Sequence, residues 1–174
     1  MIIRKLSKIK DFLTFEQLRT AVCNYVFIRL DYCNSLLYGI DKKQQNRLQV
    51  LQNRCSRLIF RQPRRSHATP LLRSLHWLPI PERIQFKVLC LCFKAFHQKS
   101  PHYLSSYFQL YRTTYALRSD STITFSVPRS KKQLGDRALS VAGPRLWNEL
   151  PPSIRGCSEL PGFKGRLKSH LFPT

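Results

Sequence analysis

Residues 134–155 read LGDRALSVAGPRLWNELPPSIR. This stretch places a glycine and a proline side by side at Gly143 and Pro144, follows them with one large aromatic side chain, Trp147, and carries three arginines. Proline fixes the backbone and glycine admits close approach, so this order is typical of helices and turns that pack together. A solvated charged tail would need neither the tryptophan nor the spacing, and we therefore expect a packed, cationic module.

Outward from this stretch, helical periodicity explains the first third of the chain. Thr14 with Gln17 forms a capping-box pattern that opens a helix, which we expect to run towards Leu37 and to stop at Gly39. Asp41 with Gln44 opens a second helix. Its apolar stripe consists of Leu48, Leu51, Cys55, Leu58 and Ile59. The short connection between the two helices predicts an antiparallel helical hairpin.

The centre of the chain predicts a buried helix. The segment from about Pro81 to Gln98 is apolar on nearly every side, which is typical of a helix at the middle of a core. Ser158 or Glu159 opens a last helix. Between them, residues 122–127 alternate in the manner of a strand, with Ile123, Phe125 and Val127 on one face.

These patterns predict a mainly α fold, in which a helical hairpin and a buried central helix are joined by a small β element in the C-terminal third. We divide the chain into a basic N-terminal arm (1–13), a helical core (14–109) and a basic C-terminal subdomain (110–174). The alternative is that residues 14–109 and 110–174 form one unit.

The charge of the chain points to a polyanionic partner. The sequence has 30 Lys and Arg against 9 Asp and Glu, a formal net charge of +21. So strong an imbalance repels itself in the compact state and usually has a polyanion to bind. Nucleic acid is the favoured partner. An anionic membrane surface and a merely solvated basic face are the alternatives.

Cysteine usage and the N-terminal sequence predict the compartment. The six cysteines are scattered through apolar helical patterns, which favours a reducing environment. The first ten residues contain no hydrophobic signal core, and the longest apolar run, residues 88–93, is too short to span a bilayer. We therefore expect an intracellular protein, nuclear or cytoplasmic, that is not secreted and has no transmembrane segment.

No catalytic pattern emerges from the residues. The nine carboxylates are dispersed with no two adjacent, whereas two-metal phosphoryl transfer needs acids that converge. The chain also lacks a phosphate-binding loop, a dinucleotide fingerprint and a nucleophile elbow. We expect no enzyme activity, no cofactor and no small-molecule substrate.

One set of residues has a spacing close to that of a zinc knuckle: Cys90, Cys92, His97 and His102. Two cysteines two residues apart on one helix face different sides, so a core role is favoured over zinc binding, which stays open.

Basic clusters carry the functional signal. Twelve residues are candidates for phosphate contacts: Arg61, Arg64, Arg65, Arg129, Lys131, Lys132, Arg137, Arg145, Arg155, Lys164, Arg166 and Lys168. Three aromatic residues, Tyr111, Tyr115 and Trp147, are candidates for base stacking, with a place in the core as the alternative for each. His76 and Trp77 are interpreted as a packed turn.

An ordered set of short motifs resembles the region beyond the polymerase core in non-LTR (LINE-type) retrotransposon reverse transcriptases. The motifs are LDYCNSLLYG at 30–39, LHWLP at 75–79, RIQFK at 83–87, PHYL at 101–104, VPRS at 127–130, GDRA at 135–138, PRLWN at 144–148, LP at 150–151, FK at 163–164 and RLK at 166–168. The resemblance implies a parent with an endonuclease, a central reverse transcriptase and this C-terminal region, which helps to hold template RNA and target DNA. The aromatic-Ala-Asp-Asp turn of the polymerase is absent, so no catalytic residue is transferred.

We therefore expect a truncated, non-catalytic module that binds RNA or DNA through backbone phosphates without sequence preference. One alternative is a structural remnant that packs on a reverse transcriptase domain through an exposed apolar surface formed by Val22, Val26, Leu48 and Leu51. An expressed pseudogene with no selected role is the other.

Overall fold

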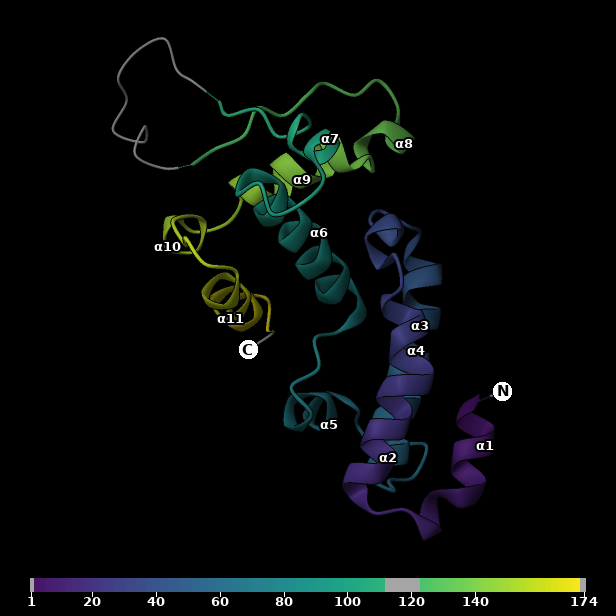
Figure 1. Ribbon diagram of the computed structural model, residues 1–174. Coiled ribbons are helices and arrows are strands. Elements are labelled where there is room, and N and C mark those ends of the chain that lie inside the picture. The colour runs from purple at the N-terminus through teal and green to yellow at the C-terminus, as the bar shows by residue number, and fades with distance from the viewer. Residues whose placement is uncertain (1, 112–122, 173–174) are drawn as a thin grey trace. The chain divides into compact units, whose positions relative to one another are not determined.

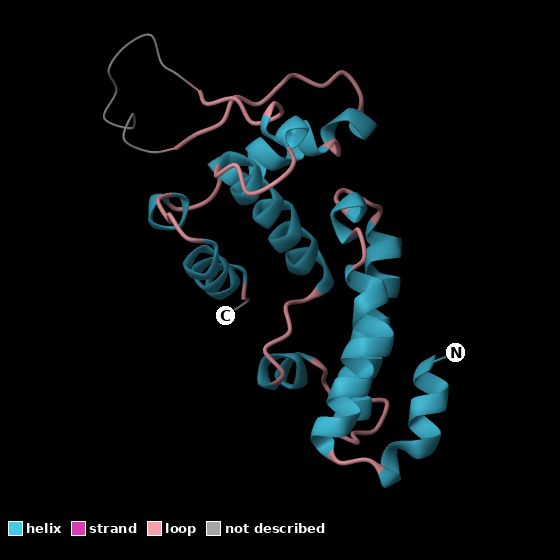
Figure 2. Ribbon diagram, viewed as in Figure 1, coloured by secondary structure: helices cyan, strands magenta, loops and turns pink. Residues whose placement is uncertain are grey.

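A computed structural model describes residues 2–111 and 123–172, and the chain forms two compact units, Met1–Pro81 and Glu82–Thr174 (Figure 1). Each unit is built from helices and loops, as Figure 2 shows, which confirms the predicted mainly α class. The boundary that we expected near residue 110 lies inside the second unit, because aromatic side chains before and after that position share one core there.

Within its described residues, the first unit contains five complete α-helices, two 3-10 turns and one π-helical turn. They are α1 (Ile2–Ile9), a 3-10 turn (Lys10–Phe12), α2 (Phe15–Val22), a π-helical turn (Cys23–Phe27), α3 (Ile28–Asp31), a second 3-10 turn (Asn34–Leu37), α4 (Lys42–Ile59) and α5 (Thr69–Ser74). The predicted capping box at Thr14 is confirmed: the Thr14 hydroxyl accepts from the Gln17 amide at 3.3 Å, and the Gln17 side chain accepts from the Thr14 amide at 2.9 Å.

The long helix predicted from Thr14 to Leu37 is divided in the structure. A π-helical turn follows α2, and the continuous helical path ends at Asp31. Cys33 then adopts a left-handed backbone conformation (φ 50°), which reverses the chain before Gly39 (φ 71°) is reached. The second helix begins after Asp41 as predicted, although the Asp41 side chain makes no capping hydrogen bond.

The helical hairpin is confirmed. Helices α2 and α4 pack against each other, and the Arg61 guanidinium, just after α4, donates to the carbonyls of Lys10 (3.2 Å) and Leu13 (2.8 Å), just before α2. The end of one helix therefore lies beside the start of the other, as an antiparallel pair requires. Leu6 of α1 is buried in the same core, so residues 1–13 are part of the first unit and not a separate arm.

Two glutamines of α4, the buried Gln52 and the half-buried Gln49, link the last residues of the first unit to the hairpin. The Gln52 side chain is fully buried and donates to the Leu78 carbonyl at 2.8 Å, while the Gln49 side-chain oxygen accepts from the Ile80 amide at 2.8 Å. Trp77, next to them, packs on Phe27 with ring centroids 4.2 Å apart. This confirms the packing that we expected for Trp77, whereas His76 is exposed and has a left-handed backbone conformation (φ 53°).

The second unit is organised around α6 (Ile80–Phe96), which begins at the end of the first unit. The helices that follow are α7 (His102–Ser105), α8 (Gln133–Asp136), α9 (Leu139–Asn148), α10 (Pro152–Arg155) and α11 (Leu160–Leu171). Phe93 of α6 stacks on Phe163 of α11 at 4.5 Å, and Phe96 contacts Trp147 of α9 at 6.4 Å. The predicted buried central helix is therefore confirmed, and Glu159 is the N-cap of the last helix as expected.

The predicted β element is wrong for the residues that the structure describes. No strand forms in 123–127, and Phe125 makes only an isolated antiparallel bridge with Leu110. The backbone of Phe125 is hydrogen-bonded to the Asn148 side chain, which takes the place of a second neighbouring strand. The Asn148 side-chain oxygen accepts from the Phe125 amide at 2.9 Å, and the Asn148 side-chain nitrogen donates to the Phe125 carbonyl at 2.8 Å. A side chain thus satisfies the backbone groups that would otherwise extend a ladder.

Across the described parts of the chain, no helix has the length and apolarity that crossing a bilayer requires.

Candidate nucleic-acid interface

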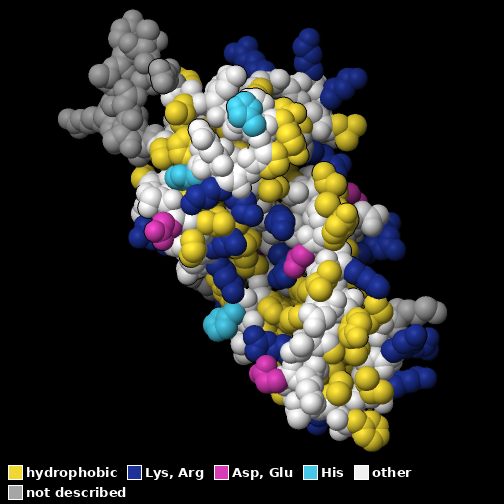
Figure 3. Space-filling model, in the orientation of Figure 1, with side chains coloured by type: hydrophobic (Ala, Val, Ile, Leu, Met, Phe, Trp, Pro, Cys, Tyr) yellow, Lys and Arg dark blue, Asp and Glu magenta, His cyan; other side chains and the backbone are white. Residues whose placement is uncertain are grey.

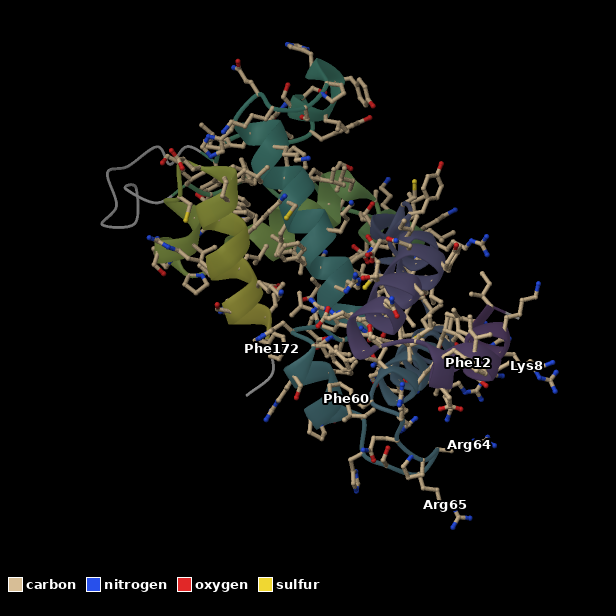
Figure 4. The ribbon with its side chains drawn as sticks, turned by 60° about the horizontal axis from the view of Figure 1, so that its bottom comes forward. Lys8, Phe12, Phe60, Arg64, Arg65 and Phe172 are labelled. Carbon is tan, nitrogen blue, oxygen red and sulfur yellow. The ribbon has the colours of Figure 1, made fainter. Side chains whose placement is uncertain are left out.

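The first unit exposes three of the predicted basic residues in one loop. Arg61, Arg64 and Arg65 lie in the connection between α4 and α5, and all three are exposed. This loop is held in place by the Arg57 guanidinium, which donates to the Ser66 carbonyl at 2.8 Å. In Figure 4 the side chains of Arg64 and Arg65 extend away from the ribbon. The loop therefore presents its charges outward from a fixed backbone.

The fold adds lysines from the N-terminal segment to this loop. Because Arg61 donates to the carbonyls of Lys10 and Leu13, the loop lies against the turn that follows α1. We call the resulting surface the basic end: Lys8, Lys10, Arg61, Arg64 and Arg65. The sequence offered no signal for this meeting, since Arg61 and Lys10 are 51 residues apart. One carboxylate, Asp11, lies within the same turn, so the surface retains a large positive excess.

The second unit places basic residues on two helices. Lys164, Arg166 and Lys168 of α11 are exposed as predicted, and Arg166 also donates to the Ser153 carbonyl at 2.8 Å. Figure 3 shows Lys and Arg side chains over the region of α6 and α11.

Lys87 and Lys94 of α6 were missed by the sequence analysis, which treated this helix only as core. Burial raises the pKa of the Cys90 thiol to about 11, and the charges of Lys164, Lys87 and Lys94 oppose that rise. The charges of all three lysines thus act on one thiol, and we call them the lysine cluster (Lys87, Lys94 and Lys164). Lys87 and Lys164 are exposed, and Lys94 is half-buried. The sequence did contain a signal for this: Lys87 and Lys94 are seven residues apart, which places them on the same side of helix α6.

The remaining basic residues that we predicted to contact phosphate differ in their exposure and in whether a carboxylate balances their charge. Arg129, Lys131 and Lys132 are exposed in the segment before α8. Arg145 lies 3.2 Å from the Asp136 carboxylate, with both side chains about half exposed, so its charge is partly balanced. Arg137 is half-buried.

Two predicted contact residues belong to the core. Arg155 is only 8% exposed, and its guanidinium donates to the Ile123 carbonyl at 3.1 Å. Trp147 is 0% exposed, and its ring nitrogen donates to the same carbonyl at 3.1 Å. Neither side chain can contact a phosphate or a base, because both are buried and donate hydrogen bonds to the backbone of the extended segment at Ile123. Tyr111 is exposed, and Tyr115 lies outside the described residues.

The suggested zinc ligands do not form a site. Among the residues that the structure describes, no three His, Cys, Asp or Glu side chains converge as metal ligands. Burial raises the pKa values of the Cys90 and Cys92 thiols, and burial followed by the charge of Lys99 lowers the pKa of His97. Cys90 and Cys92 are buried in the core, and His97 is half-buried with its ring 4.2 Å from that of Phe93. His102 is exposed.

Thiol labelling tests this placement. Iodoacetamide modifies thiolates, and burial raises the pKa of Cys55 to about 12, from an ordinary value of 9.0. At pH 8.5 we expect exposed Cys33 to be alkylated in a fast phase, and Cys55, Cys90 and Cys92 to be alkylated only as the protein unfolds. Mass spectrometry of the labelled peptides measures this for each cysteine separately, so that labelling of the half-buried Cys23 and Cys157 is resolved from that of Cys33. Cys33→Ser is the control that removes the Cys33 signal. Labelling of Cys55 as fast as Cys33 in the folded protein would contradict the structure.

Comparisons with protein-family models, with curated proteins and with solved structures find no match to this chain.

Proposed function

We propose that this protein binds RNA or DNA through backbone phosphates, without reading the base sequence and without catalysing a reaction. The observation that carries the proposal is the basic end, where positive side chains from two distant segments are held on one exposed surface. Phosphate contacts from Lys and Arg provide most of the affinity of non-specific nucleic-acid binding. The lysine cluster of the second unit supports the same function independently.

The motif resemblance gives this function an origin. We propose that the chain corresponds to the C-terminal, post-polymerase region of a non-LTR retrotransposon reverse transcriptase. In that setting a non-catalytic module would hold the nucleic acid on which a polymerase domain acts. The excess of 30 basic over 9 acidic residues fits such a role.

A steep salt dependence is the expected result of the first test. If about 5–10 phosphates are engaged, the logarithm of the association constant should fall with the logarithm of salt concentration with a slope of roughly −4 to −9. Fluorescence anisotropy of a labelled 20-base-pair DNA duplex, titrated between 50 and 200 mM salt, measures the slope. Affinity that stays constant over this range would reject the proposal.

A pair of matched double variants locates the binding surface. Replacing Arg64 and Arg65 by Ala should reduce the magnitude of the salt slope by about 2, since each lost phosphate contact removes about 0.9. Replacing the exposed pair Lys42 and Lys43 by Ala removes the same charge at the other end of α4, about 27 Å away along an 18-residue helix. Equal losses in the two variants would show that only net charge matters, and the basic end would be rejected as the contact surface.

A protein-interaction role is the second candidate, and one observation favours it. Of the apolar side chains that we expected on the surface of the hairpin, Val22 and Val26 are buried in the core, so that prediction is wrong for them. A different set is exposed on the same unit: Tyr25, Ile28, Tyr32 and Leu36. Specific retention of a non-LTR reverse transcriptase domain by the wild-type chain, lost with Ile28→Lys, would support this role.

A further inference from the structure

The basic end also carries a large apolar side chain that the fold leaves uncovered. Phe12 is 87% exposed, the most exposed of the large hydrophobic side chains that the structure describes. A phenyl ring in water costs free energy, and a core position would remove that cost. Figure 4 shows Phe12 at the same end of the unit as Lys8, Arg64 and Arg65. The Arg61 guanidinium lies closer, because it donates to the carbonyls of Lys10 and Leu13, which flank Phe12 in the chain.

The backbone that presents Phe12 is held on both sides. Phe12 ends the 3-10 turn Lys10–Phe12, and the Arg61 guanidinium donates to carbonyls on both sides of it, at Lys10 and Leu13. The capping box of α2 fixes the chain immediately afterwards, at Thr14. The turn is thus anchored to the hairpin, and the exposure of the ring is a property of the fold and not of a loose terminus.

A surface of this kind is complementary to unpaired bases. Base stacking on an aromatic ring tolerates any base, because every base has a π-face, and flanking positive charges follow the phosphates. In a duplex the base faces are already stacked on each other, so an aromatic ring gains little there. Resting on the nucleic-acid binding proposed above, we infer that the basic end prefers single-stranded nucleic acid and that Phe12 is the side chain on which a base stacks.

The test compares a single-stranded 12-nucleotide RNA with a duplex of the same length, using the full chain. Phe12→Ala should weaken binding of the single strand about 5- to 100-fold, the loss that removal of one stacking ring produces, and leave duplex binding unchanged. The salt slope should also stay unchanged, since no phosphate contact is lost. Phe12→Trp should keep single-strand affinity within about threefold of the wild type, because indole also stacks.

Tyr32→Ala is the matched control. Tyr32 is 80% exposed, lies on the same unit and follows α3, away from the Arg61 loop. If Tyr32→Ala and Phe12→Ala have equal effects, or if Phe12→Ala weakens duplex and single strand alike, the stacking role is overturned. Circular dichroism of each variant shows that the helices are intact, so that an affinity loss is not a folding loss.

Two further outcomes separate this inference from the proposed function. If the wild-type chain binds RNA with a steep salt slope but Phe12→Ala binds as tightly, the phosphate-binding function stands and the stacking role falls. If no oligonucleotide binds, both fall together. A membrane contact would give a different result. If the wild-type chain binds vesicles containing phosphatidylserine and Phe12→Ala does not, while the variant binds RNA as tightly as the wild type, the ring contacts a membrane and the inference is overturned.

Discussion

Trp147→Ala is expected to lower the free energy of unfolding of the second unit by about 3–5 kcal/mol, the range observed when a fully buried Trp or Phe is truncated. The side chain is 0% exposed and contacts the rings of Phe125, at 5.2 Å, and Phe163, at 5.6 Å. Its removal opens a cavity among these rings and also leaves the Ile123 carbonyl with one donor fewer. Urea denaturation followed by far-ultraviolet circular dichroism measures the loss.

Two features of the chain make this experiment well controlled. The sequence has two tryptophans, and Trp77, in the first unit, is the one that remains, so its fluorescence reports whether that unit stays folded. Trp147→Phe retains a ring in the core but not the hydrogen bond, and it should cost clearly less than the alanine variant. A loss below about 1 kcal/mol for Trp147→Ala would contradict the placement of this ring in the core.

Asn148→Ala is expected to lower the free energy of unfolding by about 2–3 kcal/mol. The Asn148 amide makes both hydrogen bonds to the backbone of Phe125, whose residue is 1% exposed. An unsatisfied buried donor or acceptor costs about 1–3 kcal/mol, and the variant leaves one of each. The same denaturation experiment measures the effect, and amide hydrogen exchange at Phe125 should accelerate.

Glu149→Ala is the matched control for this variant. Glu149 is the next residue in the chain, at the C-cap of α9, and is exposed. Its replacement should change stability by less than about 0.5 kcal/mol, as is usual for surface positions. If both alanine variants have the same small effect, the Asn148 amide does not hold the extended segment.

The helices were predictable because their signals are local. The capping box at Thr14, the start of α4 after Asp41 and the apolar surface of α6 each depend on residues within a few turns of one another. The π-helical turn at Cys23–Phe27 was not predictable, since it keeps the apolar side chains Val26 and Phe27 buried within the same periodic pattern. The strand at 122–127 failed because alternation does not show which partner will take the backbone hydrogen bonds.

The candidate interface was predicted only in part. The sequence around an arginine does not show whether its guanidinium will face water or a backbone carbonyl group. Arg64 is exposed on a loop, whereas Arg155 lies in the core beside the Ile123 carbonyl. Lys87 was overlooked because its helix is mostly apolar, although its side chain is exposed. Exposure is a property of the packed unit and not of the residue type.

The sequence by itself determined the charge of this protein, the starts of α2, α4 and α11 and the identity of the buried central helix, because composition and short-range periodicity are set within a few residues. Only the tertiary structure decided which charges and rings share a surface. Arg61 meets the turn before α2 across 51 residues, and this contact joins the turn that carries Phe12 to the loop that carries Arg64 and Arg65. Such a contact depends on how the hairpin closes, and no local pattern records it.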